Sequence, residues 1–137
     1  MKRQDLRERL QLVLLPLSQE MLVEKRSQDQ RGEAHFIVND QPFCRLACLS
    51  LKAGAGSRGN HYHQRKTEGF YLVSGRLLLK LKCLPSGQEL ELELLPGSRF
   101  FIPPLVAHCL TALEDLWFVE FTGHPYEQSD DCPYSFT

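Results

Sequence analysis

The sequence predicts an all-β domain, a sandwich or a barrel, with a short helical segment in front of it. The first observation is a series of short apolar runs that turn residues interrupt every ten or so positions, a pattern typical of such folds. The second is that helical spacing of apolar residues is confined to the beginning of the chain. The third is the length of 137 residues, which suits one domain with its own core.

Composition excludes several other classes of protein and of partner. Hydrophobic residues make up 42% of the chain and charged residues 24%, which excludes a disordered chain, a collagen-like repeat and a coiled coil. The chain has 16 Lys and Arg against 17 Asp and Glu, so its formal net charge is -1. No bulk electrostatic attraction to nucleic acid or to an anionic membrane follows from that balance, and neither is expected as a partner.

The cysteines and the first residues predict a compartment. Five cysteines form no CxxC pair, which argues against a structural zinc site and against a disulfide framework. Scattered thiols fit a reducing environment. The start of the chain contains no pattern of a signal peptide and no transmembrane span. We therefore expect a cytoplasmic protein.

The helical segment and a linker are expected in residues 1–33. Apolar residues recur at helical spacing across residues 6–23, at Leu6, Leu10, Val13, Leu14, Leu17 and Met21. Pro16 would kink or split a helix there, so two short helices or a helix and a loop are both open. Packing on the flank of the domain is favoured over a role as a dimerisation arm. A polar stretch, residues 24–33, follows as the linker.

Strand patterns occupy the rest of the chain up to residue 121. The expected strands are 34–38, 43–51, 69–73, 76–84, 88–95, 99–102, 106–111 and 116–121. The alternation is strictest in 88–95, where Leu and Glu take turns, as in a strand with one solvated face. The tail, residues 122–137, is polar and either wraps the domain or is loose.

Four side chains have the types and spacing of metal ligands. His61 and His63 are two residues apart, so in a strand they point to the same face. Glu68 follows after a short polar connection, and His108 lies in a second strand pair. Three imidazoles and one carboxylate suit a borderline divalent metal ion. We expect one such ion on His61, His63, Glu68 and His108; zinc, iron, manganese, nickel and copper all remain open.

The two segments that carry these residues resemble the paired motifs of the cupin superfamily. The first cupin motif, G-x5-HxH-x4-E-x6-G, is matched by His61, His63, Glu68 and Gly75, with Ala55 at its leading Gly. The second motif, G-x5-PxG-x2-H-x3-N, is matched by Gly97, Pro103 and His108. Leu105 stands at its inner Gly and Ala112 at its final Asn. These departures affect turn and supporting positions and leave the four presumed ligands in place.

The resemblance implies a cupin double-stranded β-helix, a jelly-roll barrel, over residues 34–121. It leaves residues 1–33 as the N-terminal helical segment and linker and residues 122–137 as a C-terminal tail. A homodimer is also expected, because exposed strand edges of such sheets need cover.

A second resemblance concerns the substrate. Residues 29–32 (Asp-Gln-Arg-Gly) and 58–63 (Arg-Gly-Asn-His-Tyr-His) look like those of cupins that act on nucleotide-linked sugars. They imply a metal-dependent isomerase or epimerase acting on a sugar or nucleotide-sugar, a small polar metabolite. A metal-dependent dioxygenase and a non-catalytic small-molecule-binding cupin remain alternatives, and no catalytic residue beyond the ligands is assigned. An anionic substrate could meet Arg45, Lys52, Arg58 or Arg99, although each taken singly is more typical of a solvated rim.

Overall fold

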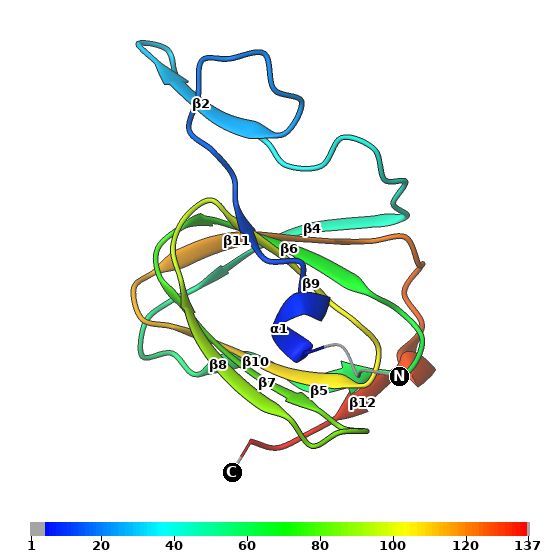
Figure 1. Ribbon diagram of the computed structural model, residues 1–137. Helices are drawn as coiled ribbons and strands as arrows, with labels where there is room; N and C mark the ends of the chain where they lie inside the picture. Colours follow the sequence, from blue (N-terminus) through cyan, green and yellow to red (C-terminus); the bar gives the residue numbers. More distant parts are fainter. Residues whose placement is uncertain (1–4, 137) are drawn as a thin grey trace.

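In the computed structural model, which describes residues 5–136, two five-stranded antiparallel sheets face each other and form a barrel (Figure 1). The first sheet has the order β1 (Val13–Leu14), β9 (Ser98–Ile102), β6 (Glu68–Ser74), β11 (Leu116–Thr122) and β4 (Arg45–Leu51). The second has the order β12 (Asp131–Pro133), β5 (Ser57–His63), β10 (Val106–Ala112), β7 (Leu77–Cys83) and β8 (Glu89–Leu94). The predicted all-β barrel is confirmed.

The core lies between the two sheets. In β7 the residues Leu77, Leu79 and Leu81 are buried, whereas Leu78, Lys80 and Lys82 at the alternate positions are only half-buried, as the two-residue period of a strand requires. Phe70 of β6 and Phe100 of β9 stack with their ring centroids 5.1 Å apart. These apolar side chains pack in the barrel, and a small cavity lies beside the polar residues described below.

The predicted short N-terminal helical segment is confirmed as the helix α1 (Leu6–Arg9), which has a single turn. Of the two arrangements that the sequence left open, a helix followed by non-helical chain is the one observed. Leu6 and Leu10 are fully buried, and α1 lies between the sheets at one end of the barrel (Figure 1). Gln11 then takes a left-handed backbone conformation with a φ of 50°, and the chain pairs with β9 as strand β1. An available sheet edge therefore overrides the local helical pattern. Within residues 5–136, no helix is long and apolar enough to cross a membrane.

The predicted linker forms a hairpin instead of an irregular connection. Strands β2 (Lys25–Asp29) and β3 (Gly32–Phe36) pair as a separate two-stranded sheet that stands off the barrel in Figure 1. Its base is fixed to the first sheet by an ion pair of 2.8 Å between Glu24 and Arg99. The polar composition of this stretch is explained by its exposure, because a hairpin with two solvated faces has no apolar alternation.

The tail wraps the domain. A short 3-10 helix, η1 (Gln128–Asp130), leads into β12, which pairs antiparallel with β5. Because β5 carries His61 and His63, the tail lies directly against the strand of the presumed ligands. The division of the chain at residues 33 and 121 stays a prediction.

Candidate functional site

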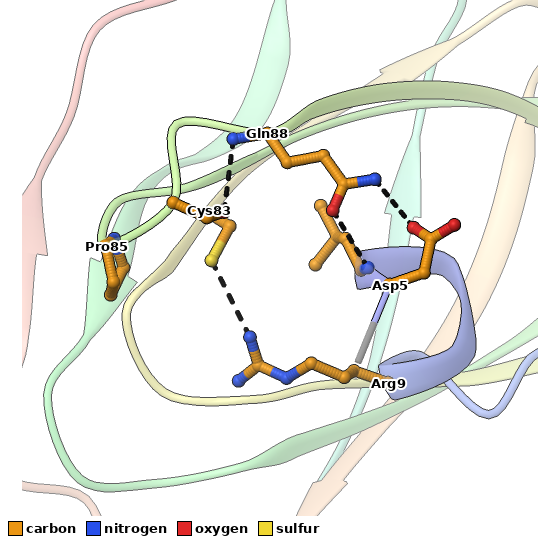
Figure 2. Close-up of a pocket in the computed structure, with 7 residues that line it drawn as sticks. Asp5, Arg9, Cys83, Pro85 and Gln88 are labelled. Carbon is orange, nitrogen blue, oxygen red and sulfur yellow. Dashed lines mark hydrogen bonds between the residues drawn. The ribbon is translucent and has the colours of Figure 1, made fainter. Parts of the chain in front are cut away.

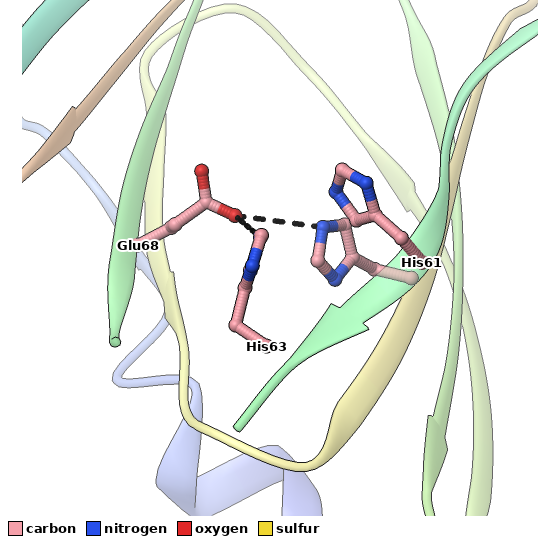
Figure 3. Close-up of side chains that lie close together, drawn as sticks. His61, His63 and Glu68 are labelled. Carbon is pink, nitrogen blue, oxygen red and sulfur yellow. Dashed lines mark ion pairs between the residues drawn. The ribbon is translucent and has the colours of Figure 1, made fainter. Parts of the chain in front are cut away.

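The structure brings the four predicted ligands together inside the barrel. Each offers one ligand atom, and these atoms all lie within 4.8 Å of one another. His61 and His63 project from β5, Glu68 begins β6, and His108 lies on β10 directly opposite His61 (Figure 3). We call His61, His63, Glu68 and His108 the quartet. The same-face prediction for the two histidines of β5 is therefore consistent with their positions.

The three imidazoles turn one nitrogen outward and the other toward the centre of the quartet. The outward Nδ1 atoms meet oxygens of Asp130 (carbonyl, 3.1 Å from His63), Val106 (carbonyl, 3.2 Å from His108) and Asp131 (carboxylate, 2.8 Å from His61). The carbonyl oxygens only accept, so His63 and His108 donate through Nδ1. In the neutral form of these rings, Nε2 consequently carries the lone pair and faces the centre of the quartet, which is the arrangement of histidines that bind a metal ion.

The carboxylate of Glu68 is buried among positive and polar groups. Its Oε1 lies 2.6 Å from Nε2 of His63 and 3.6 Å from Nε2 of His108, and its Oε2 lies 3.8 Å from Nζ of Lys66. Burial acts to raise the pKa of Glu68, but His63, His108 and Lys66 together lower it to about 2. Glu68 is therefore ionised at neutral pH.

Burial also sets the protonation of the histidines. It lowers the pKa of His108 to about 4 and lowers the pKa of His61, in spite of the nearby Glu68 and Asp131 carboxylates. Burial likewise opposes the charge on His63, but the adjacent Glu68 carboxylate raises its pKa overall. Two of the three imidazoles are thus neutral at physiological pH and have lone pairs available as ligands.

These residues fit a divalent metal ion. Nε2 of His63 and Oε1 of Glu68 are buried without a hydrogen-bond partner although they lie side by side, and an unsatisfied buried pair of this kind is costly. A cation between the Nε2 atoms and the carboxylate oxygen would satisfy both of them. The donor set of three imidazoles and one carboxylate suits the borderline metals expected from the sequence.

A cavity of about 160 Å³ opens beside the quartet. Its lining consists of Leu49, Arg58, Gly59, His61, Phe70, His108, Leu110, Phe118 and Glu120. A second cavity of about 320 Å³ shares Gly59 and His61 with the first and is otherwise lined by Asn60, Tyr126, Gln128, Asp131 and Pro133. His61 therefore lies between an inner cavity, whose lining mixes apolar and titratable side chains, and an outer, polar one.

Another cavity, of about 420 Å³, lies at the end of the barrel beneath α1 (Figure 2). Arg9 donates to the Sγ atom of Cys83 there over 3.6 Å, and Gln88 bridges to Asp5. Its described lining residues include no member of the quartet. This cavity seats the helix against the β7–β8 turn and is separate from the metal-type site.

The cationic residues noted in the sequence take different places. Arg58 lines the inner cavity, and the guanidinium of Arg45 lies 4.9 Å from the ring centroid of Tyr126 near the outer one. Arg99 instead pairs with Glu24 at the base of the hairpin, away from the lining of both cavities. Lys52 is exposed in the turn after β4.

Three residues at the site were missed from the sequence. Glu120 follows Leu116 and Phe118 at the two-residue period of inward positions in β11, and that parity could have identified it. Asp130 and Asp131 lie in the polar tail, where no local pattern indicates their partners. The Asp130 carboxylate also accepts the backbone N–H groups of Gln64 and Arg65, so the tail holds the turn that follows β5.

Leu105, which stands at the inner glycine position of the second cupin motif, has a left-handed backbone conformation. Its φ is 64°, in the left-handed region that disfavours a branched side chain. Its N–H donates to the carbonyl of His63 over 2.7 Å. The turn before β10 therefore carries local backbone strain at Leu105.

Comparison with known proteins places this geometry in context. A sequence model of the family described as polysaccharide biosynthesis C-terminal domain matches residues 27–130. None of the curated proteins compared with the chain matches it.

Three solved structures illustrate the likeness in fold. A variant of the 3,4-ketoisomerase QdtA from Thermoanaerobacterium thermosaccharolyticum, in complex with TDP-4-keto-6-deoxyglucose, is 19% identical, with a TM-score of 0.69 over 88% of this chain and 85% of that one. The dTDP-4-dehydrorhamnose 3,5-epimerase from Sulfolobus tokodaii is 22% identical, with a TM-score of 0.71 over 82% and 74%. The capsular polysaccharide assembling protein CapF from Staphylococcus aureus is 21% identical, with a TM-score of 0.61 over 80% of this chain and 32% of that one. The cupin jelly-roll barrel predicted from the two motifs is confirmed.

Proposed function

The chain belongs to the polysaccharide biosynthesis C-terminal domain family, and from that premise we propose that it is an enzyme that isomerises or epimerises a nucleotide-linked keto-sugar. The proposal is supported by the similarity in fold to a ketoisomerase and an epimerase that act on such sugars. The observation that carries it is the quartet beside a small, half-open cavity that His61 and His108 line, which is a place for chemistry next to a carbonyl group.

The two adjoining cavities suit the two halves of such a substrate. The inner one, about 160 Å³, is smaller than the roughly 300–1,000 Å³ of sites that take whole drug-sized ligands. It has room for a sugar ring against Phe70 and Phe118. The outer cavity, about 320 Å³ and polar, would take the nucleotide, with Tyr126 as a stacking surface. Arg58 would pair with the diphosphate between them.

We further propose that the quartet holds one divalent metal ion. When bound, such an ion would act as a Lewis acid that polarises the ketone of the sugar and stabilises the enolate formed from it. The chain's own residues bind and orient: Asp131 fixes the ring of His61, and the carbonyl of Asp130 fixes the ring of His63. Phe70 and Phe118 exclude water from the reacting carbon and strengthen the electrostatic interactions within the cavity.

The metal is tested by elemental analysis of protein purified without a chelator and without a polyhistidine tag. We expect about one equivalent of a divalent metal in the wild type, lost in His61→Ala and retained in His124→Ala, whose histidine is exposed and outside the quartet. A wild type that remains metal-free after incubation with zinc, manganese, nickel, iron and copper salts would contradict the metal. It would leave His61, His63 and Glu68 as acid–base groups.

The reaction is tested with TDP-4-keto-6-deoxyglucose in deuterium oxide. Metal-loaded protein should introduce deuterium at a carbon next to the ketone, as seen by proton NMR, without consuming oxygen. Substrate-dependent oxygen uptake by an iron- or copper-loaded protein would replace the proposal with a dioxygenase. A thermal shift caused by the nucleotide-sugar, with neither exchange nor oxygen uptake, would indicate a binding protein.

A further inference from the structure

One carboxyl group in the inner cavity has no part in the quartet. Glu120 lies on β11, where Leu116 and Phe118 at the preceding inward positions are buried, and it lines the same cavity as His61 and His108. Among residues 5–136, no hydrogen bond and no ion pair is made to its carboxylate. An inward position of a barrel strand normally carries an apolar side chain, so a partly buried carboxyl without a partner needs an explanation.

The surroundings of Glu120 raise the pKa of its carboxyl group above the ordinary value. Burial raises its pKa, and the charge of Glu68 on β6 raises it further. Lys66 before β6, Arg45 on β4 and His63 on β5 act in the opposite direction. A carboxyl group whose pKa is raised toward the working pH exchanges protons more readily in both directions than an exposed one.

Among the described residues that line the inner cavity, Glu120 is the one that can transfer a proton to and from a substrate. Of the residues around the inner cavity, only Arg58, His61, His108 and Glu120 have titratable side chains. The histidine lone pairs are directed at the centre of the quartet, and an arginine does not accept a proton. Of the described residues that line this cavity, Glu120 is therefore the one whose side chain can take a proton from a substrate.

We propose that Glu120 is the catalytic residue that carries the proton between two neighbouring carbons of the sugar, an inference that rests on the proposed function. The Glu120 carboxylate takes the proton from the hydroxyl-bearing carbon next to the ketone. The electron pair of that C–H bond becomes the C=C bond of an enediolate, and the carbonyl pair moves onto the oxygen. The hydroxyl proton passes to that oxygen. Glu120 exchanges its proton with solvent and delivers a proton to the former ketone carbon, so that the ketone has moved by one carbon and nothing is consumed.

This assignment also selects between the two reactions of the proposed function. One carboxyl group can serve both carbons of the enediolate from a single face, which is sufficient for migration of the ketone. Inversion at one carbon requires a second group on the opposite face, and the described lining of the inner cavity offers none outside the quartet. Glu120 thus indicates a ketoisomerase.

The test compares metal-loaded wild type, Glu120→Gln and the control Glu114→Gln, which alters an exposed carboxylate paired with Arg76. We expect Glu120→Gln to keep its metal and to bind TDP within about threefold of wild type, and to exchange deuterium into the keto-sugar at least about 100-fold more slowly. Glu114→Gln should exchange at the wild-type rate. Exchange by Glu120→Gln within threefold of wild type would overturn the role of Glu120 while leaving the proposed function intact.

Two further measurements separate the remaining outcomes. In metal-free protein, the carboxyl carbon of Glu120, assigned by its loss in Glu120→Gln, should titrate above the ordinary range of a glutamate side chain; a value within or below that range would overturn the proposal. If Glu120→Gln does not fold, Glu120→Asp replaces it, and the shortened side chain should slow exchange more than it weakens TDP binding. A wild type that exchanges no deuterium would overturn the proposed function, and this inference with it.

Discussion

The backbone of Gly59 lies against the carbonyl of His108, so closely that a Cβ atom at position 59 would come within 2.7 Å of that oxygen. Gly59 also has a φ of +88°, in the left-handed region. The contact coincides with the register shift between His108 and Cys109, where β10 bends against β5. The close approach of these two strands is what brings His61 and His108 to opposite sides of one centre.

Gly59→Ala is therefore expected to disturb the quartet as well as the fold. Backbone strain and the overlap with the His108 carbonyl should together lower the free energy of unfolding by about 1–3 kcal/mol, measured by urea denaturation. The displaced His108 should also weaken metal retention. Gly54→Ala is the matched control, because Gly54 has a φ of +77° but open space around it. Equal metal retention by the two variants would show that the contact does not position His108.

Asp131→Asn tests whether the tail orients His61. The carboxylate lies 2.8 Å from Nδ1 of His61, and replacing it by a neutral amide removes the charge that fixes the ring and its tautomer. Metal affinity, measured by competition with a chelator, should fall about 10- to 100-fold. Asp40→Asn, at an exposed position between the hairpin and β4, should leave the affinity unchanged. Unchanged affinity in Asp131→Asn would mean that His61 is oriented by packing alone.

His108 should make the metal-free protein sensitive to acid. Its pKa is about 4 in the folded state, against about 6.5 in the unfolded chain, so below pH 6.5 the unfolded state binds the proton first. The stability that this group provides is complete above pH 6.5 and is lost as the pH falls toward 4, by up to about 3 kcal/mol. His63, whose pKa is raised, acts in the opposite direction, which makes the comparison with a variant necessary.

The comparison uses urea denaturation of metal-free wild type and His108→Gln at pH 7 and pH 5. The variant should lose less of its unfolding free energy between the two pH values than the wild type does. A variant as acid-sensitive as the wild type would show that His108 is not the group that titrates on unfolding.

The strained turn at Leu105 predicts an unusual order of stability for two variants. Leu105→Gly and Leu105→Ala both remove the side chain, but only glycine adopts the left-handed φ of 64° without cost. Leu105→Gly should therefore unfold with a free energy about 1 kcal/mol higher than that of Leu105→Ala. At Ala47 on β4, where φ is not positive, replacement by glycine should be destabilising instead. Equal stability of the two Leu105 variants would show that the turn relaxes.

The barrel and the quartet are predictable from the sequence because both depend on short-range spacing. Inward and outward residues alternate along each strand, as in Leu77–Cys83, and His61 and His63 share a face for the same reason. Glu68 and His108 could be added through the spacing of the two cupin motifs, which reflects the fixed strand lengths of that barrel.

Interactions between distant segments could not be predicted in this way. The pairing of Val13–Leu14 with β9 replaces a helix that local spacing favours, and no window around residue 13 contains that partner. Asp131 likewise meets His61 across 70 positions of sequence, through a three-residue strand whose composition is that of a loop. Glu120 could be predicted only in part. Its inward position follows from the two-residue period of β11, but the cavity that it lines is formed by other strands as well.

The pairing of β12 with β5 also has a consequence for how the protein loses activity on heating. Asp130 and Asp131 are neighbours on one short segment, and each holds a different histidine of the quartet. Detachment of a three-residue strand requires far less free energy than global unfolding, and it releases both rings in one step. Inactivation should therefore precede the loss of β-sheet signal during a thermal ramp, and amide protons of β12 should exchange with solvent earlier than those of β7 and β10.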